Sequence, residues 1–242
     1  MRILVTNDDG INAEGLRHLA EFAAKLGEVV VAAPKYQQSG RSHGVVIDRP
    51  FEVVPVDNFR YLSIKAYSID ASPADCVRFS FDYFKEKFDF VFAGINKGLN
   101  LGADISYSGT CGICFEAGLW GAKAIGFSSK SKHIPESAAH LQEIWDHLNC
   151  IDAFSHCGLF NVNIPVDPKG IKITEQGEFW YKDRYVPTGE GNLYNPEYTL
   201  VKDENGPLDD RYDIDAIISG YISVTPLTTV KTDLKAFEEL RK

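Results

Sequence analysis

The sequence predicts an α/β fold: a doubly wound, mostly parallel sheet of the Rossmann-like type, with a C-terminal extension that contains a hairpin. Three near-continuous apolar runs of strand length, at 2–6, 29–34 and 88–94, are typical of parallel strands covered on both faces. Between the first two runs, apolar residues recur at helical spacing over 13–26. These segments form a β-α-β unit, and 242 residues are enough to bury a sizeable core around it.

The next helix has a recognisable start at SPAD. Ser72 can cap it, Pro73 suits the first helical position, and Asp75 favours the positive end of the helix dipole. We expect this helix to run to about Phe84. The other expected core elements are extended segments at 44–56 and 61–69, a strand at 88–94, a glycine-rich loop at 94–109, a helix at 110–121, a strand at 123–129, a helix at 136–150 and a strand at 159–165.

After residue 165 the pattern changes to shorter strands. Residues 174–185 are expected to form a hairpin, followed by an aromatic, proline-containing stretch to about residue 207. A short helix and a strand are predicted within 214–227, and a terminal helix at 232–242. The chain is therefore divided into an α/β core (1–165), a hairpin-containing appendage outside the sheet (166–213) and a helix-strand-helix segment (214–242).

Composition argues against several classes of protein. The formal net charge is −9 without a dense basic run, so an extended nucleic-acid ligand is not expected. No segment approaches the ~18 consecutive apolar residues of a spanning helix, and no basic stretch precedes an apolar one at the N-terminus, so we expect a cytoplasmic protein without membrane contact. The five cysteines are odd in number and irregularly spaced, which favours reduced thiols over a disulfide framework.

Three loops that follow predicted strands carry most of the candidate chemistry: NDDG (7–10), KYQQSGRSHG (35–44) and GINKGLNLGADISYSGT (94–110). Ligands of open α/β sheets bind beyond the carboxyl ends of the strands, so parallel strands would bring these loops to one rim. In the first loop, Asp8 and Asp9 are adjacent like charges at the end of a buried strand. An ordinary turn explains them, but a divalent cation would also offset their repulsion.

The other two loops supply neutral oxygen atoms. A flexible glycine loop would account for 94–110, and a simple turn for the Ser39–Gly40 pair. However, 94–110 ends where a helix begins, and helix N-termini bind phosphate through free N–H groups. Oxygen ligands without His or Cys favour Mg²⁺, Mn²⁺ or Ca²⁺ over zinc. The oxygen-bearing candidates are Ser39, Asn96, Asn100, Ser106, Ser108 and Thr110.

Five blocks of sequence resemble, in order, the SurE family of metal-dependent 5′/3′-nucleotidases: ILVTNDDGINAEGL, VVAAPKYQQSG, SPADCVRF, GINKGLNLGADISYSGT and GYISVTPL. Together they extend over nearly the whole chain. The resemblance implies hydrolysis of nucleoside monophosphates by the 1–165 core, and a homodimer or homotetramer in which C-terminal segments exchange between subunits. It also implies one divalent cation per subunit, Mg²⁺ or Mn²⁺. The implied ligands are Asp8, Asp9, Ser39 and Asn96.

On this interpretation the cation binds the phosphate and a water molecule, and it lowers the pKa of that water. Asp8 or Asp9 takes the proton as general base, with both kept as candidates. Backbone N–H groups at 108–110 would cradle the phosphate, while Lys97 and Arg41 are interpreted as solvated surface cations. The expected substrate contacts are Gly40, Asn100, Ser108, Gly109 and Thr110.

Other interpretations of these motifs stay open. Cys111 and Cys114 form a C-x-x-C pair that could be redox-active or bind zinc, but their helical spacing favours buried small hydrophobes. The function could also be a metal–nucleotide binding module without turnover, or a phosphatase of broad specificity. Aromatic residues of the appendage could stack on a nucleobase or pack against another subunit. They are Phe179, Trp180, Tyr181, Tyr185, Tyr194 and Tyr198.

Overall fold

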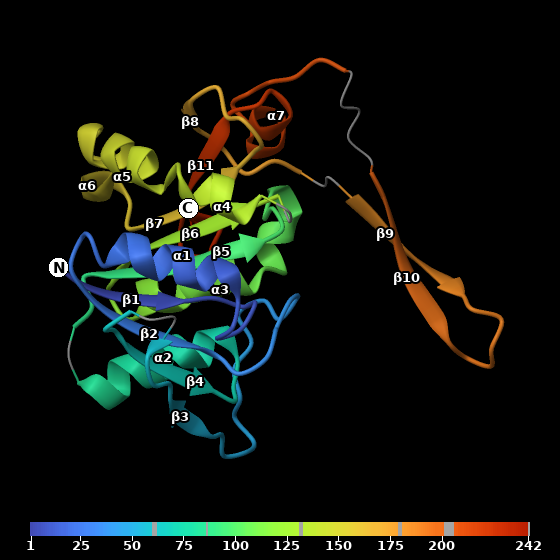
Figure 1. The fold of residues 1–242 in the computed structure, drawn as a ribbon. Helices are drawn as coiled ribbons and strands as arrows, with labels where there is room; N and C mark the ends of the chain where they lie inside the picture. The colour runs from blue at the N-terminus through green and yellow to red at the C-terminus, as the bar shows by residue number, and fades with distance from the viewer. Residues whose placement is uncertain (60–61, 86, 131–132, 179–180, 201–205, 242) are drawn as a thin grey trace.

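The computed structural model describes residues 1–59, 62–85, 87–130, 133–178, 181–200 and 206–241. Its centre is a nine-stranded sheet in the order β3-β4-β2-β1-β5-β6-β7-β11-β8, and a separate two-stranded sheet pairs β9 with β10. Figure 1 shows the large sheet inside the body of the molecule and the small sheet projecting away from it. The predicted α/β class is confirmed.

The doubly wound order arises at β1. From β1 the chain passes through α1 to β2, which lies parallel to β1 on one side, while β5 lies parallel to β1 on the other side. The sheet therefore changes its winding direction between β1 and β5, and ligands of such sheets bind beyond this point. The elements of this half are β1 (Arg2–Thr6), α1 (Glu14–Ala23), β2 (Glu28–Pro34), β3 (Val53–Pro55), β4 (Lys65–Ile69), α2 (Pro73–Phe84) and β5 (Phe90–Lys97).

The second half of the chain adds four strands to the large sheet and forms the separate hairpin sheet. β6 and β7 continue the parallel order, β11 is antiparallel to β7, and β8 pairs in parallel with β11. The elements are η2 (Gly102–Ser106), α3 (Gly109–Leu119), β6 (Lys123–Ser129), α4 (Ile134–Ala138), α5 (Leu141–Cys150), α6 (Ala153–His156), β7 (Leu159–Ile164), β8 (Ile171–Ile173), β9 (Tyr181–Pro187), β10 (Tyr194–Leu200), α7 (Asp213–Ile218), β11 (Ile222–Leu227) and α8 (Leu234–Leu240).

Two apolar clusters cover the two faces of the large sheet. One cluster joins the sheet to α1, α4, α5 and α6, and it contains the fully buried Phe92 and Phe127. The other joins the sheet to α2 and α3 and contains Val77 and Ile113. Each fully buried side chain of this size stabilises the fold by about 1.5–3 kcal/mol. Burial on both faces explains why the central strands are almost continuously apolar in sequence.

The predicted start of α2 is confirmed in detail. The Ser72 hydroxyl accepts a hydrogen bond from the Asp75 N–H at 3.1 Å, and the Asp75 carboxylate accepts one from the Ser72 N–H at 3.3 Å. This reciprocal pair is a capping box, and Pro73 occupies the first helical turn as expected.

Three predicted segments have different limits in the structure. The hairpin consists of β9 and β10 rather than residues 174–185. Only Val53–Pro55 of the extended segment 44–56 is a strand. The helix predicted at 136–150 is divided into α4 and α5. The hairpin strands and residues 44–56 are largely exposed, so their sequences lack the apolar periodicity that defines the buried elements. By contrast, α5 keeps that periodicity and buries Leu141, Ile144 and Leu148.

The expectation that the appendage lies wholly outside the sheet is wrong at β8. This strand forms one edge of the nine-stranded sheet, next to β11. Its three residues are partly or fully exposed, as is usual for an edge strand, so no buried apolar run marks it in the sequence. The predicted helix and strand within 214–227 are confirmed as α7 and β11, and the terminal helix as α8.

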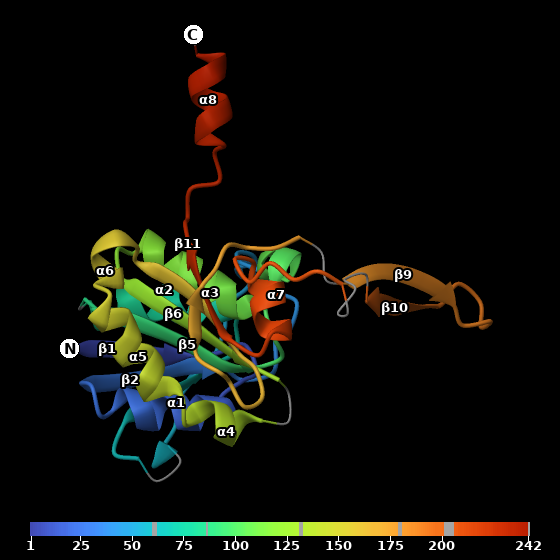
Figure 2. The same cartoon turned by 90° about the horizontal axis from the view of Figure 1, so that it is seen from above.

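Two elements project from the body. The β9–β10 hairpin extends to one side, and α8 stands away from the sheet at another edge (Figure 2). No residue of α8 is buried. Among the described residues, no helix has the length and apolar character needed to span a membrane.

Candidate active site

The turn after β1 is closed by the Asn7 side chain. The Asn7 amide donates to the Gly10 carbonyl at 3.0 Å, and its oxygen accepts the Gly10 N–H at 3.1 Å. Gly10 has φ of 97°, a conformation that favours glycine. The turn fixes Asp8 and Asp9 in different environments, because Asp8 is buried and Asp9 is half-buried.

Asp8 lies against the first turn of α3. Its Oδ1 atom accepts a hydrogen bond from Thr110 Oγ1 at 2.8 Å. A Cβ at Gly109 would lie 2.8 Å from the Asp8 Cβ, so only glycine allows this approach. The pKa of Asp8 is raised to about 6, because burial and, to a smaller extent, the charge of Asp9 raise it more than the hydrogen bond from Thr110 lowers it. Asp8 therefore brings a poorly compensated negative charge into the rim.

Asp9 connects the other two loops. Its Oδ1 accepts from Gln37 Nε2 at 3.2 Å, and its Oδ2 accepts from the Lys97 N–H at 2.9 Å. The same Gln37 nitrogen donates to Ser39 Oγ at 3.0 Å. A third contact, from the Gln38 N–H to the Asp8 carbonyl at 2.7 Å, also joins the second loop to the first.

These bonds confirm that the three loops meet at one rim. Asn96 directly precedes the Lys97 N–H that binds Asp9. Its Nδ2 donates to the Gly98 carbonyl at 2.8 Å, so Oδ1 is the atom of that amide suited to a cation. The four predicted ligands thus belong to segments that are hydrogen-bonded to one another around Asp9.

The predicted phosphate contacts lie beside Asp8 at the N-terminus of α3. Ser108 caps this helix by accepting the Cys111 N–H at 3.1 Å, while its own N–H donates to the Asp104 carbonyl at 3.1 Å. The Thr110 backbone also contributes a hydrogen bond to Asp8. The Ser108 and Thr110 N–H groups are therefore used within the protein, whereas Gly109 remains the best-placed backbone donor for an anion.

Gly40 and Asn100 have different positions. Gly40 has φ of 71° and open space around its Cα, so it forms an accessible left-handed turn next to Ser39. Asn100 is buried at the ends of β6 and β7, where its N–H donates to Asn163 Oδ1 at 2.7 Å and its Nδ2 to Ser128 Oγ at 2.8 Å. Nδ2 carries a second N–H, and this is the donor through which a phosphate contact remains predicted.

The residues at the rim fit a hard divalent cation. Within the described ranges, no cluster of three or more His, Cys, Asp or Glu side chains suited to a metal was found. The available set combines the Asp8 and Asp9 carboxylates with the neutral oxygens of Ser39 and Asn96, which suits Mg²⁺ or Mn²⁺. The buried charge of Asp8 is the feature that such a cation would compensate.

A cavity of about 340 Å³ opens next to Asp9. Its lining includes Asp9, Gln37 and Lys97 from the three loops, with Ile134 and Pro135 from the start of α4. The cavity therefore shares one carboxylate with the proposed ligand set.

The C-x-x-C pair is not placed for redox chemistry. Cys111 and Cys114 are both buried, and burial raises the pKa of Cys111 to about 12 and that of Cys114 well above its usual value. Thiols of this kind are mostly protonated and react poorly as nucleophiles or ligands. The interpretation as small buried hydrophobes agrees with this environment.

Sequence reasoning missed Gln37. Its Nε2 atom bridges Asp9 and Ser39, and so it orders two predicted ligands from two loops. Its position two residues before Ser39 in a loop that follows a strand was the available signal. Phe179 and Trp180, two of the predicted aromatic contacts, lie outside the described residues.

Comparison with known proteins gives one consistent result. The family model described as "Survival protein SurE" matches residues 3–183. A 5′-nucleotidase SurE from Clostridium beijerinckii is 33% identical over 254 residues, covering 100% of this chain and 98% of the relative. One from Thermosipho melanesiensis is 36% identical over 253 residues, with 99% and 97% covered. The crystal structure of the SurE protein from Aquifex aeolicus matches with a TM-score of 0.77 and 31% identity, over 100% of this chain and 98% of that one.

Proposed function

The chain belongs to the SurE family, and we propose that it is a nucleotidase that hydrolyses nucleoside monophosphates with a divalent cation held by Asp8, Asp9, Ser39 and Asn96. Its relatives are named 5′-nucleotidases, and we extend the proposal to 3′ esters. The observation that carries the assignment of the site is the convergence of three loops on Asp8 and Asp9 beside the N-terminus of α3.

The cation, Mg²⁺ or Mn²⁺ with one per subunit, supplies charge neutralisation for the phosphate and a water molecule of lowered pKa. The protein's own residues then determine orientation. Gln37 and the Lys97 N–H hold the Asp9 carboxylate, and Thr110 holds that of Asp8. Gly109, Gly40 and Asn100 provide contacts for the phosphate oxygens. Asp8 or Asp9 accepts the proton of the attacking water as general base.

Phosphate release from a nucleoside monophosphate tests this proposal. We expect turnover of AMP with Mn²⁺ or Mg²⁺, and loss of turnover with EDTA. Asp8→Asn should reduce kcat/KM by about 10³-fold, because the residue is both ligand and candidate base. Asp82→Asn, which changes an exposed carboxylate on α2, is the matched control. It should retain wild-type activity.

Other outcomes select the remaining alternatives. Tight metal-dependent binding of AMP without phosphate release would identify a binding module and contradict the enzyme. Equal turnover of sugar phosphates and nucleotides would identify a broad phosphatase. Release that is unaffected by both EDTA and Asp8→Asn would contradict the proposed site.

We further propose a homodimer or homotetramer formed through the projecting elements. Exposed apolar side chains lie on both projections, including Tyr185 and Tyr198 on the hairpin and Leu234 and Leu240 on α8. Side chains of this kind favour burial against another subunit, and exchange of residues 214–242 would provide it.

The described cysteines are free thiols, which supports a reducing, cytoplasmic location.

A further inference from the structure

The loop that carries Ser39 is long and irregular. Residues 35–52 connect β2 to β3, and all of them are described, but they contain no helix or strand. Gly40 and Ser42 both have positive φ, of 71° and 53°. A segment of this kind is held by tertiary contacts rather than by its own hydrogen-bond ladder, so the contacts after Ser39 decide how well that ligand is positioned.

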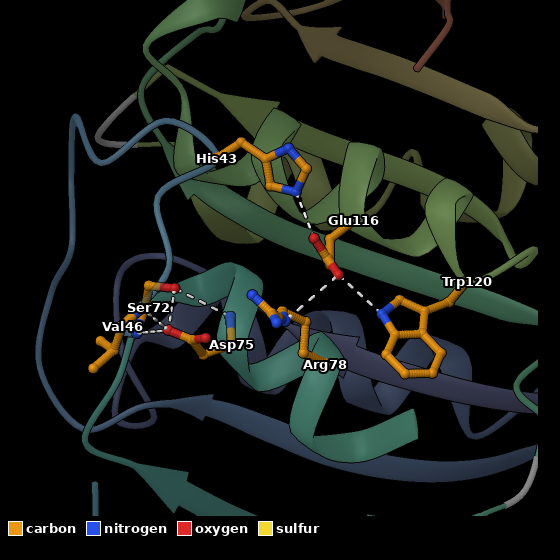
Figure 3. Close-up of polar contacts among 7 residues, drawn as sticks. All are labelled: His43, Val46, Ser72, Asp75, Arg78, Glu116 and Trp120. Atoms are coloured by element: carbon orange, nitrogen blue, oxygen red, sulfur yellow. Dashed lines mark hydrogen bonds and ion pairs between the residues drawn. The ribbon is translucent and has the colours of Figure 1, made fainter. Parts of the chain in front are cut away.

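His43 provides one of these contacts. Its Nε2 lies 2.7 Å from Oε2 of Glu116, on α3. Figure 3 shows the Glu116 carboxylate between three partners from different elements. Its other oxygen, Oε1, accepts from Trp120 Nε1 at 2.9 Å and lies 3.9 Å from Arg78 Nε on α2.

The Glu116 carboxylate is suited to a fixed hydrogen-bonding role. Its side chain is only 10% exposed, while that of His43 is 22% exposed. Burial alone would raise the pKa of Glu116, but hydrogen bonds from His43 and Trp120 and the charge of Arg78 outweigh it and lower that pKa. Glu116 is therefore ionised at neutral pH, and a partly buried, charge-assisted bond to His43 is stronger than an exposed one.

Neighbouring contacts extend this anchoring. The Ser42 hydroxyl donates to the Ser106 carbonyl at 2.6 Å, and its N–H donates to the Tyr107 carbonyl at 3.0 Å. The Val46 N–H donates to Asp75 at 2.8 Å, using the carboxylate that also caps α2 (Figure 3). Among these contacts, the bond from His43 ties the loop directly to α3, the helix whose first turn lies against Asp8.

We propose that His43 and Glu116 are positioning residues that fix the Ser39 loop against α3 and thereby set the affinity of the site for metal and nucleotide. This proposal rests on the function proposed above. It predicts that the bond matters more for ligand binding than for overall stability. A purely structural ion pair would change stability alone.

A set of matched variants tests the proposal. His43→Ala removes the bond to the loop, and His43→Gln retains a side-chain N–H donor of similar reach. Trp120→Phe is the control, because it removes a donor to the same carboxylate without touching the loop. We expect His43→Ala to raise the Mn²⁺ dissociation constant and the KM for AMP by about tenfold, as is usual for groups that orient ligands. His43→Gln should recover most of this loss, and Trp120→Phe should show less than about a twofold change.

Hydrogen exchange of the metal-free protein gives an independent measurement. The Ser42 and Val46 amides should exchange about tenfold faster in His43→Ala than in the wild type, and at the wild-type rate in Trp120→Phe. Equal metal affinity and KM in His43→Ala and Trp120→Phe would overturn the positioning role, even if exchange became faster. Absence of both AMP turnover and Mn²⁺ binding in the wild type would instead overturn the proposed function.

Discussion

The body of the molecule and its two projections are stabilised in different ways. In the body, residues such as Phe92 and Phe127 have no exposed surface, and the loops of the rim are joined by hydrogen bonds. On the hairpin, Tyr185 and Tyr198 are each 73% exposed, and the Leu240 side chain of α8 is 88% exposed. The comparison indicates that the body carries its own core, whereas the projections need further contacts. Four predictions test this contrast.

The largest effect is expected at Asp213, at the base of the hairpin. Its buried carboxylate accepts the N–H groups of Gly102, Gly177 and Ile214, each at 2.8 Å. Asp213→Ala leaves three donors without this acceptor, so the free energy of unfolding should fall by about 4 kcal/mol in urea denaturation. A loss below about 1 kcal/mol would show that the body does not depend on such buried bonds.

The second prediction concerns Asp8, a destabilising group within the well-bonded body. Its pKa is raised in the folded state from 3.8 to about 6, so the folded state holds the proton more tightly than the unfolded state does. This preference stabilises the fold fully below pH 3.8, and the stabilisation is lost as the pH rises through 6. In EDTA, the stability of the wild type relative to Asp8→Asn should therefore fall by about 2 kcal/mol between pH 4 and pH 7. Urea denaturation at several pH values measures this difference. A difference that does not change with pH would contradict the buried charge.

The third prediction concerns association. Tyr185→Arg combined with Tyr198→Arg should raise the subunit dissociation constant by about 100-fold, since exposed aromatics at interfaces often dominate binding. Light scattering over a range of concentrations measures the change. Tyr83→Arg alters a tyrosine that is 58% exposed on α2 of the body, and it should leave the assembly intact. If light scattering gave the same molecular mass for the double variant on the hairpin and for Tyr83→Arg, association would depend no more on the hairpin than on the body.

The smallest effect is expected within the hairpin. Arg184 pairs with Glu197 at 2.7 Å across β9 and β10, but the two side chains are 67% and 46% exposed. Exposed pairs contribute little, so Arg184→Ala should change the free energy of unfolding by less than about 0.5 kcal/mol. This variant is also the matched control for Asp213→Ala. A loss as large as that of Asp213→Ala would show that hairpin and body unfold as one unit.

The same contrast explains what the sequence could predict. The central strands and the loops after β1, β2 and β5 were predictable, because burial on both faces leaves continuous apolar runs and parallel strands place their loops on one rim. Asp8, Asp9, Ser39 and Asn96 follow from that rule with the family resemblance. The Ser72 cap was predictable because its contacts are local.

Other features depend on contacts between distant parts of the chain. Gln37 bridges Asp9 and Ser39 only after two loops meet, and the Asn100 network requires β7 to lie beside β6. The bond between His43 and Glu116 joins residues 73 positions apart. The hairpin was misplaced because its strands are largely exposed on both faces and so show little alternation.

The base of the hairpin segment has a consequence for engineering. Glu175 and Tyr212 form a bridge where the chain leaves and returns, with the Glu175 N–H bound to the Arg211 carbonyl at 2.7 Å and the Asp213 N–H bound to the Glu175 carbonyl at 2.9 Å. The chain therefore leaves and returns at adjacent points, as it does at the junction of an inserted module. Such a module can be replaced without changing the order of the strands in the sheet. A foreign domain grafted between these two points would therefore leave the catalytic scaffold's connectivity unchanged.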